Sequence, residues 1–240
     1  MVILSDRSVL RIHSIHLHQR KVISLPDSIG YLSSLKKMSV NRNRLTCLPD
    51  SIGNLTSLTE VDVECNQLTY LPDSICNLVC LNELCAYNNQ LTRLPDSIGN
   101  LASLTKLCVS FNHLTHLPDS IGNLTSLTEL NVCHNNLTSL PASIGNLRCL
   151  DRLQVSHNQL SALPDSIEKL ASLTLLSVNN NQLTYLPDSI CNLQALSLLN
   201  FHDNPLSSTE SGRNEISRKC ISRRIWLYVV SLFNNSYSYY

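Results

Sequence analysis

The chain has 240 residues, equal numbers of acidic and basic residues, and only 15% charged residues in total. This neutral composition argues against nucleic acid as a partner, because nucleic-acid binding requires a continuous stripe of lysine and arginine. The length would allow one or two domains, but a repeat that runs through most of the chain without a linker predicts one elongated domain.

Residues 1–11 precede the repeats, and we expect them to form an N-terminal cap. The apolar run from Met1 to Leu4 is too short for the core of a secretory signal, and no small-residue cleavage site follows it. The first repeat keeps its apolar positions but has Arg20 where later copies have asparagine. Such atypical terminal repeats are expected where one side of a stack has no neighbour.

A unit of 23 residues recurs eight times from Ile12 to Ala195, and a ninth copy begins at Leu196 and breaks off. The copy that starts at Leu127 shows its pattern clearly: L-x-x-L-x-V-x-x-N-x-L-x-x-L-P-x-x-I-x-x-L. One unit of this size cannot bury its apolar face alone, so the copies must stack into a solenoid.

Each unit combines a strand with a helical turn. The segment Leu130-Asn-Val132 alternates apolar and polar residues, which predicts a short strand with one buried face. The proline of the following Leu-Pro pair ends the extended run and opens a helical turn. We therefore expect one parallel sheet on one side and a layer of turns on the other. The turn's glycine is replaced by Cys76, Glu168 and Cys191 in three copies, which indicates ordinary helical dihedrals.

An asparagine follows each strand from the second repeat onward, at the sharp turn that leaves the sheet. Because this position faces the core, its amide must be paired, and we expect it to bond backbone groups of its own and neighbouring loops. A ligand-binding ladder would be the functional alternative, which the inward orientation disfavours. The structural ladder comprises Asn43, Asn66, Asn89, Asn112, Asn135, Asn158, Asn181 and Asn204.

The pattern is identified as the leucine-rich repeat. Its Leu-Pro-x-x-Ile-x-x-Leu form resembles the intracellular repeats of Ras-suppressor and scaffold-type proteins, and is similar to plant Ras-group-related and disease-resistance relatives and to bacterial repeat proteins. The resemblance covers residues 12–206. It implies an α/β solenoid, a horseshoe with a concave parallel sheet and short helical or 3-10 turns on the convex side. It also implies a signalling scaffold or adaptor that binds a protein, with small GTPases or phosphatases as candidate partners.

The outward strand positions vary between copies, whereas the core positions hardly do. They are basic at the N-terminal end, then acidic, and then carry the aromatic pair Tyr87 and Phe111. Exposed aromatic residues beside charge of one sign are typical of a protein-binding hot spot, although drift on a merely solvated face would also produce such variation. The predicted partner-binding residues are Lys37, Glu60, Asp62, Glu64, Glu83, Tyr87, Lys106, Phe111, Glu129 and Arg152.

No motif indicates catalysis or a cofactor. The chain lacks a phosphate loop, a metalloprotease motif and a nucleophile elbow. His16 and His18 share one face of the first strand, but Lys36 and Lys37 on the next strand disfavour a bound metal ion. A row of aspartates follows the prolines, where the turn dipole stabilises a carboxylate, and this interpretation is preferred to a calcium site. We predict no enzyme activity, no metal and no cofactor.

The ten cysteines are scattered over different repeats rather than clustered at the ends. Secreted leucine-rich repeat proteins usually carry clustered cysteines in flanking caps. Free thiols suit a reducing compartment, which favours the cytoplasm. Cys85 and Cys108 are expected to be neighbours on adjacent strands, and solvated free thiols are preferred there to a metal or redox pair.

Residues 207–240 are expected to form a C-terminal linker followed by a basic amphipathic segment. Apolar residues recur at helix spacing from Ile216 to Leu232, with basic residues between them. A helix that caps the last repeat is favoured, and a helix lying on a membrane surface or a partly disordered tail are the alternatives. Two rival functions therefore stand beside the scaffold: a bacterial effector-type repeat protein that acts on a host protein, and a membrane-tethered adaptor that uses this tail.

Overall fold

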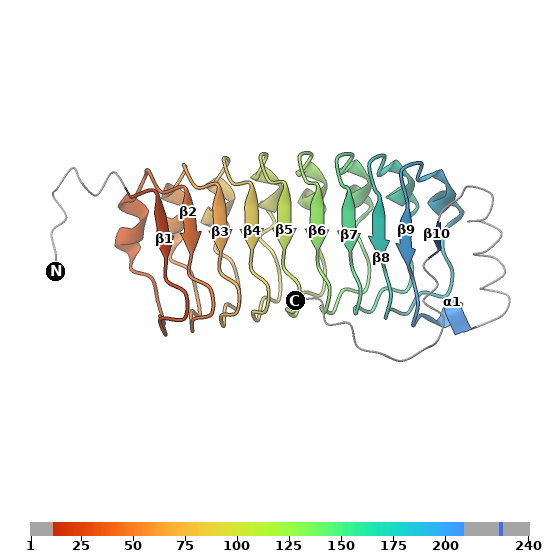
Figure 1. Cartoon of the computed structure of the whole chain (residues 1–240), viewed down its shortest axis with the longest axis horizontal. Helices are drawn as coiled ribbons and strands as arrows, with labels where there is room; N and C mark the ends of the chain where they lie inside the picture. The colour runs from red at the N-terminus through yellow and green to blue at the C-terminus, as the bar shows by residue number, and fades with distance from the viewer. Residues whose placement is uncertain (1–11, 209–225, 228–240) are drawn as a thin grey trace.

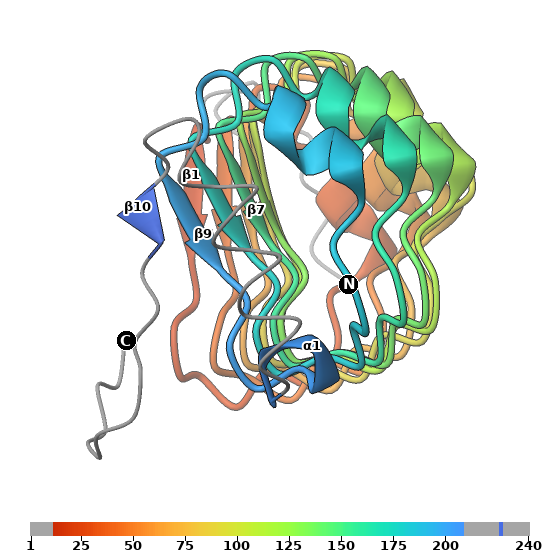
Figure 2. The ribbon, with the colours of Figure 1, turned by 90° about the vertical axis from the view of Figure 1, so that its right-hand side faces the viewer.

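The computed structural model describes residues 12–208 and 226–227. The repeats stack side by side into one elongated body, with strands on one side and turns on the other (Figures 1 and 2). The predicted leucine-rich repeat solenoid is confirmed. Its strands form one parallel sheet in chain order. From β1 to β9, paired residues of neighbouring strands are one repeat apart in the sequence. The strands are β1 (Ser14–His16), β2 (Lys37–Ser39), β3 (Glu60–Asp62), β4 (Glu83–Cys85), β5 (Lys106–Cys108), β6 (Glu129–Asn131), β7 (Arg152–Gln154), β8 (Leu175–Ser177), β9 (Leu198–Asn200) and β10 (Trp226–Leu227).

The opposite layer consists of short 3-10 turns. They are η2 (Asp27–Tyr31), η3 (Asp50–Asn54), η4 (Asp73–Asn77), η5 (Ile98–Asn100), η6 (Asp119–Asn123), η7 (Ala142–Asn146), η8 (Asp165–Lys169) and η9 (Asp188–Asn192). Proline precedes each five-residue turn in an extended conformation, as Pro118 does before η6 with φ −66°. The aspartates stand at the first residue of all but two of these turns, where the dipole favours a negative charge.

The core fills the space between the sheet and the turns. In β5 the central Leu107 is fully buried, while Lys106 and Cys108 on either side are half-exposed. Val109 beyond the strand and Ile121 in η6 are also fully buried. The same positions are buried in the complete repeats from β2 to β8, whereas Ile15 and Leu17 of the first repeat are partly buried and pack against this core. The two-residue period of the strands and the spacing of the turns thus produce one continuous apolar core.

The ladder asparagines bond the backbone of their own and the preceding repeat. Asn112 Nδ2 lies 3.0 Å from the carbonyl oxygens of both Ala86 and Val109, and its Oδ1 accepts the Leu91 N–H at 2.9 Å. The same set of bonds recurs at Asn66, Asn89, Asn135, Asn158, Asn181 and Asn204. Each amide thus ties two adjacent repeats together.

The turn glycines are needed for close stacking rather than for unusual dihedrals. None of the described glycines has a positive φ, which confirms the expected helical conformation. A Cβ added at Gly99 would lie only 2.2 Å from the Ser120 backbone oxygen of the next repeat. Where Cys76 replaces glycine, the following turn η5 is shortened to three residues and begins after Ser97.

The chain after the repeats departs from the expectation in two places. Pro205–Ser208 form a short helix, α1, so Ser207 and Ser208 belong to a helical turn rather than to a linker. The helix expected through Trp226 and Leu227 is wrong there, because these residues form β10 and pair with β9. An edge strand presents unpaired N–H and C=O groups, which this pairing satisfies. The expected N-terminal cap and the rest of the predicted C-terminal segment lie outside the described residues.

Candidate protein-binding surface on the sheet

The outward side chains of the strands, with those one to three residues beyond each strand, form an exposed surface that we call the sheet face. Because strands pair in register one repeat apart, equivalent residues stand side by side, as Glu60, Glu83 and Lys106 do. Adjacent parallel strands lie about 4.8 Å apart, so side chains in such a row contact one another.

Ion pairs interrupt the predicted acidic stretch. Lys37 Nζ lies 2.6 Å from Glu60 Oε1, and Lys106 Nζ lies 3.7 Å from Glu129 Oε2. Partial burial lowers the pKa of Lys106, but Glu129 and other nearby groups outweigh this effect and the pKa is raised overall. Arg152 Nε lies 3.4 Å from Asp151 Oδ2 in its own repeat. These exposed pairs set the charge pattern and contribute little stability.

Asp62 and Glu64 differ from the paired carboxylates. Asp62 accepts hydrogen bonds from the Ser39 hydroxyl at 3.0 Å, from the Asn41 amide and from the Glu64 backbone N–H at 3.1 Å. All of these donors are neutral. Glu64 is half-buried, and burial followed by the nearby charge of Asp62 raises the pKa of its carboxyl group. Together with the exposed Glu83, which forms no ion pair with any described residue, these two residues give this part of the sheet face its acidic character.

Four ring side chains form a continuous row beside Glu64. Tyr87 meets Phe111 edge to face, with ring centroids 5.2 Å apart and an interplanar angle of 75°. Phe111 stacks on His134, and His134 on His157, each with a centroid distance of 4.0 Å. Phe111 remains 44% exposed. We call Tyr87, Phe111, His134 and His157 the ring row.

The backbone explains the alignment of the ring row. Phe111, His134 and His157 occupy the same position of successive repeats, and all three have left-handed dihedrals with φ between 52° and 54°. Identical backbones repeated at the strand spacing bring flat side chains into stacking distance. Burial lowers the pKa of both histidines, and the neighbouring histidines lower it further.

Sequence reasoning found Tyr87 and Phe111 and brought them together correctly, but it missed His134 and His157. The prediction compared three outward strand positions between copies and did not extend to the position after them. A comparison of that next position would have placed Phe111, His134 and His157 in successive copies.

The thiols in the middle of the sheet face are protonated. Cys85 and Cys108 are register partners, as expected. Burial and the neighbouring Cys108 raise the pKa of Cys85 to about 12, and burial raises that of Cys133 to about 11. Since the thiolate is the nucleophile and the metal ligand, these side chains act as small apolar groups at neutral pH.

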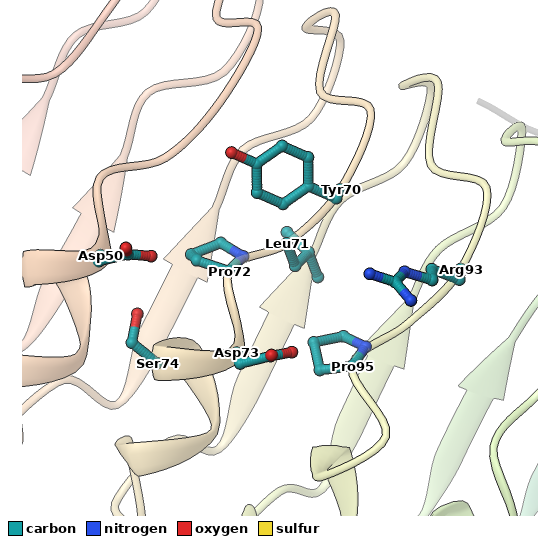
Figure 3. Close-up of a pocket in the computed structure, with 8 residues that line it drawn as sticks. All are labelled: Asp50, Tyr70, Leu71, Pro72, Asp73, Ser74, Arg93 and Pro95. Carbon is teal, nitrogen blue, oxygen red and sulfur yellow. The ribbon is translucent and has the colours of Figure 1, made fainter.

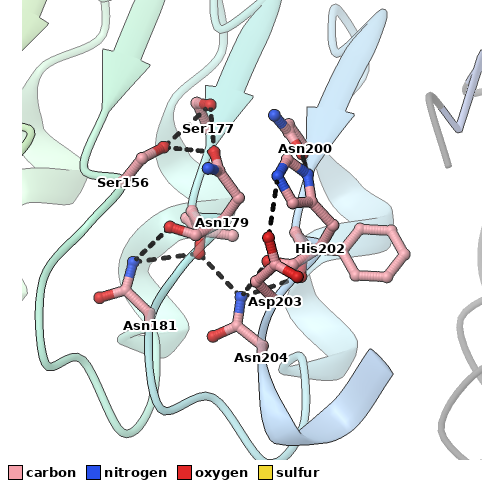
Figure 4. A network of polar contacts seen from close by, with 10 residues as sticks. Ser156, Ser177, Asn179, Asn181, Asn200, His202, Asp203 and Asn204 are labelled. Atoms are coloured by element: carbon pink, nitrogen blue, oxygen red, sulfur yellow. Dashed lines mark hydrogen bonds and ion pairs between the residues drawn. The ribbon is translucent and has the colours of Figure 1, made fainter. Parts of the chain in front are cut away.

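In the C-terminal part of the sheet face, the polar side chains form hydrogen bonds with one another (Figure 4). The Ser156 hydroxyl lies within hydrogen-bond distance of two acceptors, Ser177 Oγ at 3.1 Å and Asn179 Oδ1, and shares its one hydrogen between them. Ser177 also donates to Asn179 Oδ1. His202 pairs with Asn200 Oδ1. These polar groups already have partners, so they offer less to a ligand than Glu64 and the ring row do.

A hollow lies away from the sheet face, on the loops that lead into the turns (Figure 3). It has a volume of about 590 Å³, and Tyr70 and Arg93 are among the residues that line it, with Asp50, Asp73, Pro72 and Pro95. Its lining carries charges of both signs and includes the consensus residues Leu71 to Ser74 of one repeat. No residue of this hollow was expected to be functional.

The described part of the chain offers neither a metal site nor a membrane-spanning helix. No group of three or more histidine, cysteine, aspartate or glutamate residues could hold a metal ion there. No helix there is long and apolar enough to cross a membrane.

Comparison with known proteins identifies the family. The family model described as leucine-rich repeat region matches residues 61–136 and 130–216, which is more than half of the chain. The chain therefore belongs to the leucine-rich repeat family. A search of curated proteins gave no significant match.

Several solved structures share the fold. The plant peptide hormone receptor RGFR1, solved in complex with RGF2, is 29% identical, with a TM-score of 0.74 over 81% of this chain and 33% of the receptor chain. PEPR1, solved with AtPEP1, is 26% identical, with a TM-score of 0.70 over 80% of this chain and 28% of that chain. YopM, a leucine-rich effector protein from Yersinia pestis, is 30% identical, with a TM-score of 0.67 over 80% of this chain and 55% of that chain. The chain thus spans about a third of the receptor chains and about half of YopM.

Proposed function

We propose that this chain is a non-enzymatic binding module that holds a protein partner on its sheet face and serves as a scaffold or adaptor in signalling. One observation carries the proposal. The ring row presents exposed aromatic surface directly beside the carboxylates Asp62 and Glu64, whereas much of the surrounding sheet face is paired internally. Aromatic side chains next to charge dominate the energetics of many protein interfaces.

The similar structures support a protein or peptide as the ligand. RGFR1 and PEPR1 were solved in complexes with RGF2 and AtPEP1, respectively. The ten predicted partner-binding residues belong to this proposal, and the ring row adds His134 and His157 to them. Partners in small GTPase or phosphatase pathways are suggested only by the resemblance to Ras-suppressor and scaffold-type repeats.

We place the proposed activity in the cytoplasm. Within the described part of the chain, cysteines 47, 65, 76, 80, 85, 108, 133 and 149 are free thiols. Free thiols persist in reducing compartments and are at risk of oxidation outside the cell.

The test is capture of partners from an extract of the source cells with two double variants. Tyr87→Ala/Phe111→Ala removes aromatic surface from the sheet face, and Tyr31→Ala/Tyr185→Ala removes exposed aromatic surface from other parts of the repeats. Circular dichroism and thermal unfolding establish that both variants fold. We expect a partner that binds the wild type and the second variant but not the first. Equal capture by all three proteins would refute binding through the ring row.

A further inference from the structure

We propose that the partner places a lysine or arginine side chain on the sheet face, where its cationic head contacts the Glu64 carboxylate and the Tyr87 ring. The apolar stem of the same side chain packs against Phe111. This inference rests on the proposed function and specifies which chemistry the partner must present.

The first step is the position of Glu64 beside Tyr87. Strands β3 and β4 pair in register up to Asp62 and Cys85, and the pairing continues past their ends, where the Cys65 N–H donates to the Tyr87 carbonyl oxygen at 2.8 Å. Glu64 and Tyr87 are therefore equivalent residues of adjacent repeats, and their side chains leave the same side of the sheet. Phe111 lies one position further along in the next repeat, and its ring centroid is 5.2 Å from that of Tyr87.

The second step is that neither carboxylate is held in a salt bridge with a described residue. Burial and Asp62 raise the pKa of the Glu64 carboxyl group, and Arg42 and Lys106 lower it in part from a distance, but within the described residues neither cation pairs with it. Among the residues that the structure describes, neither Asp62 nor Glu64 forms a salt bridge, although Glu60 and Glu129 do. Asp62 is held in place by neutral donors only. A partner that covered Glu64 with apolar groups alone would bury an unpaired charge, which is strongly unfavourable.

The third step is the aromatic surface that adjoins the carboxylates. The faces of tyrosine and phenylalanine rings attract cations, and arginine in particular stacks on them. Phe111 is 44% exposed, so apolar surface is available next to the charge. Lysine and arginine combine a cationic head with an apolar stem that packs against such surface. A lysine or arginine side chain therefore pairs with the carboxylates and packs on the rings at the same time. An anionic or a purely apolar side chain cannot do both.

A random peptide library displayed on phage, selected on the immobilised wild-type chain, tests the proposal. We expect the recovered peptides to be enriched in lysine or arginine. Synthetic copies should lose affinity by about tenfold or more on Glu64→Gln and on Tyr87→Ala, as expected when one partner of a desolvated charged contact is removed. Affinity should also fall with increasing salt.

Two matched variants serve as controls, since Glu168→Gln and Tyr185→Ala make the same changes at exposed positions outside the sheet face. Peptides that lose binding on Phe111→Ala but carry no excess of basic residues, or that bind Glu64→Gln unchanged, would overturn this inference and leave the proposed function standing. Peptides that bind Tyr87→Ala and Phe111→Ala as well as the wild type would overturn both.

Discussion

Removal of one ladder amide should show how strongly the repeats depend on their neighbours. Asn112 is 5% exposed, and its Oδ1 accepts the N–H of Leu91, which is fully buried. In Asn112→Ala this N–H loses its acceptor. The carbonyl oxygens of Ala86 and Val109 lose one donor each, but Asn89 and Asn135 still donate to them. The orphaned N–H therefore sets the cost, and we expect the free energy of unfolding to fall by roughly 1–3 kcal/mol.

Denaturant unfolding followed by circular dichroism measures this loss. The matched control is Asn123→Ala, because Asn123 is an exposed asparagine at the end of η6. The control should unfold within about 0.5 kcal/mol of the wild type, as most surface substitutions do. An Asn112→Ala variant as stable as the control would refute the claim that the ladder binds adjacent repeats together.

Three further outcomes follow from contacts in the turns and the ring row. Gly99→Ala should destabilise the fold by about 1–3 kcal/mol, measured by thermal unfolding, because its Cβ would meet the Ser120 carbonyl oxygen. Ser143→Ala should leave the unfolding midpoint unchanged or raise it, since the buried Ser143 hydroxyl has no hydrogen-bond partner among the described residues. Burial lowers the pKa of His134 and His157 from the ordinary 6.5. Their neutral forms therefore stabilise the fold above that value, and this stabilisation is lost as the pH falls through the lowered pKa. Denaturation at about pH 7.5 and about pH 5 should show a larger loss for the wild type than for a double glutamine variant.

The regular part of the fold was predictable because each repeat meets the same constraints. The alternation at Leu130 and Val132 defines a strand, the following proline opens a turn, and a core asparagine must pair with backbone. Period and residue type were sufficient for these features, since every interior repeat has the same two neighbours.

Features that depend on contacts between particular side chains were predicted less well. The acidic stretch was expected from a list of charges, but the cross-strand pair of Lys37 with Glu60 depends on which charge stands beside which. The stack of His134 and His157 depends on a left-handed backbone conformation, which cannot be predicted from the type of a single residue. The strand β10 pairs with β9 at the end of the sheet, where the repeat pattern has already stopped and no longer constrains the chain.

Site-specific photocrosslinking tests the central claim most directly, namely that the sheet face contacts a protein partner. A benzoylphenylalanine is placed at Phe111 in one protein and, as a control on the opposite layer, at Tyr31 in η2 in another. After irradiation in extracts of the source cells, we predict a covalent adduct with one partner at Phe111 and none at Tyr31. An adduct with that partner at Tyr31 and none at Phe111 would contradict binding on the sheet face.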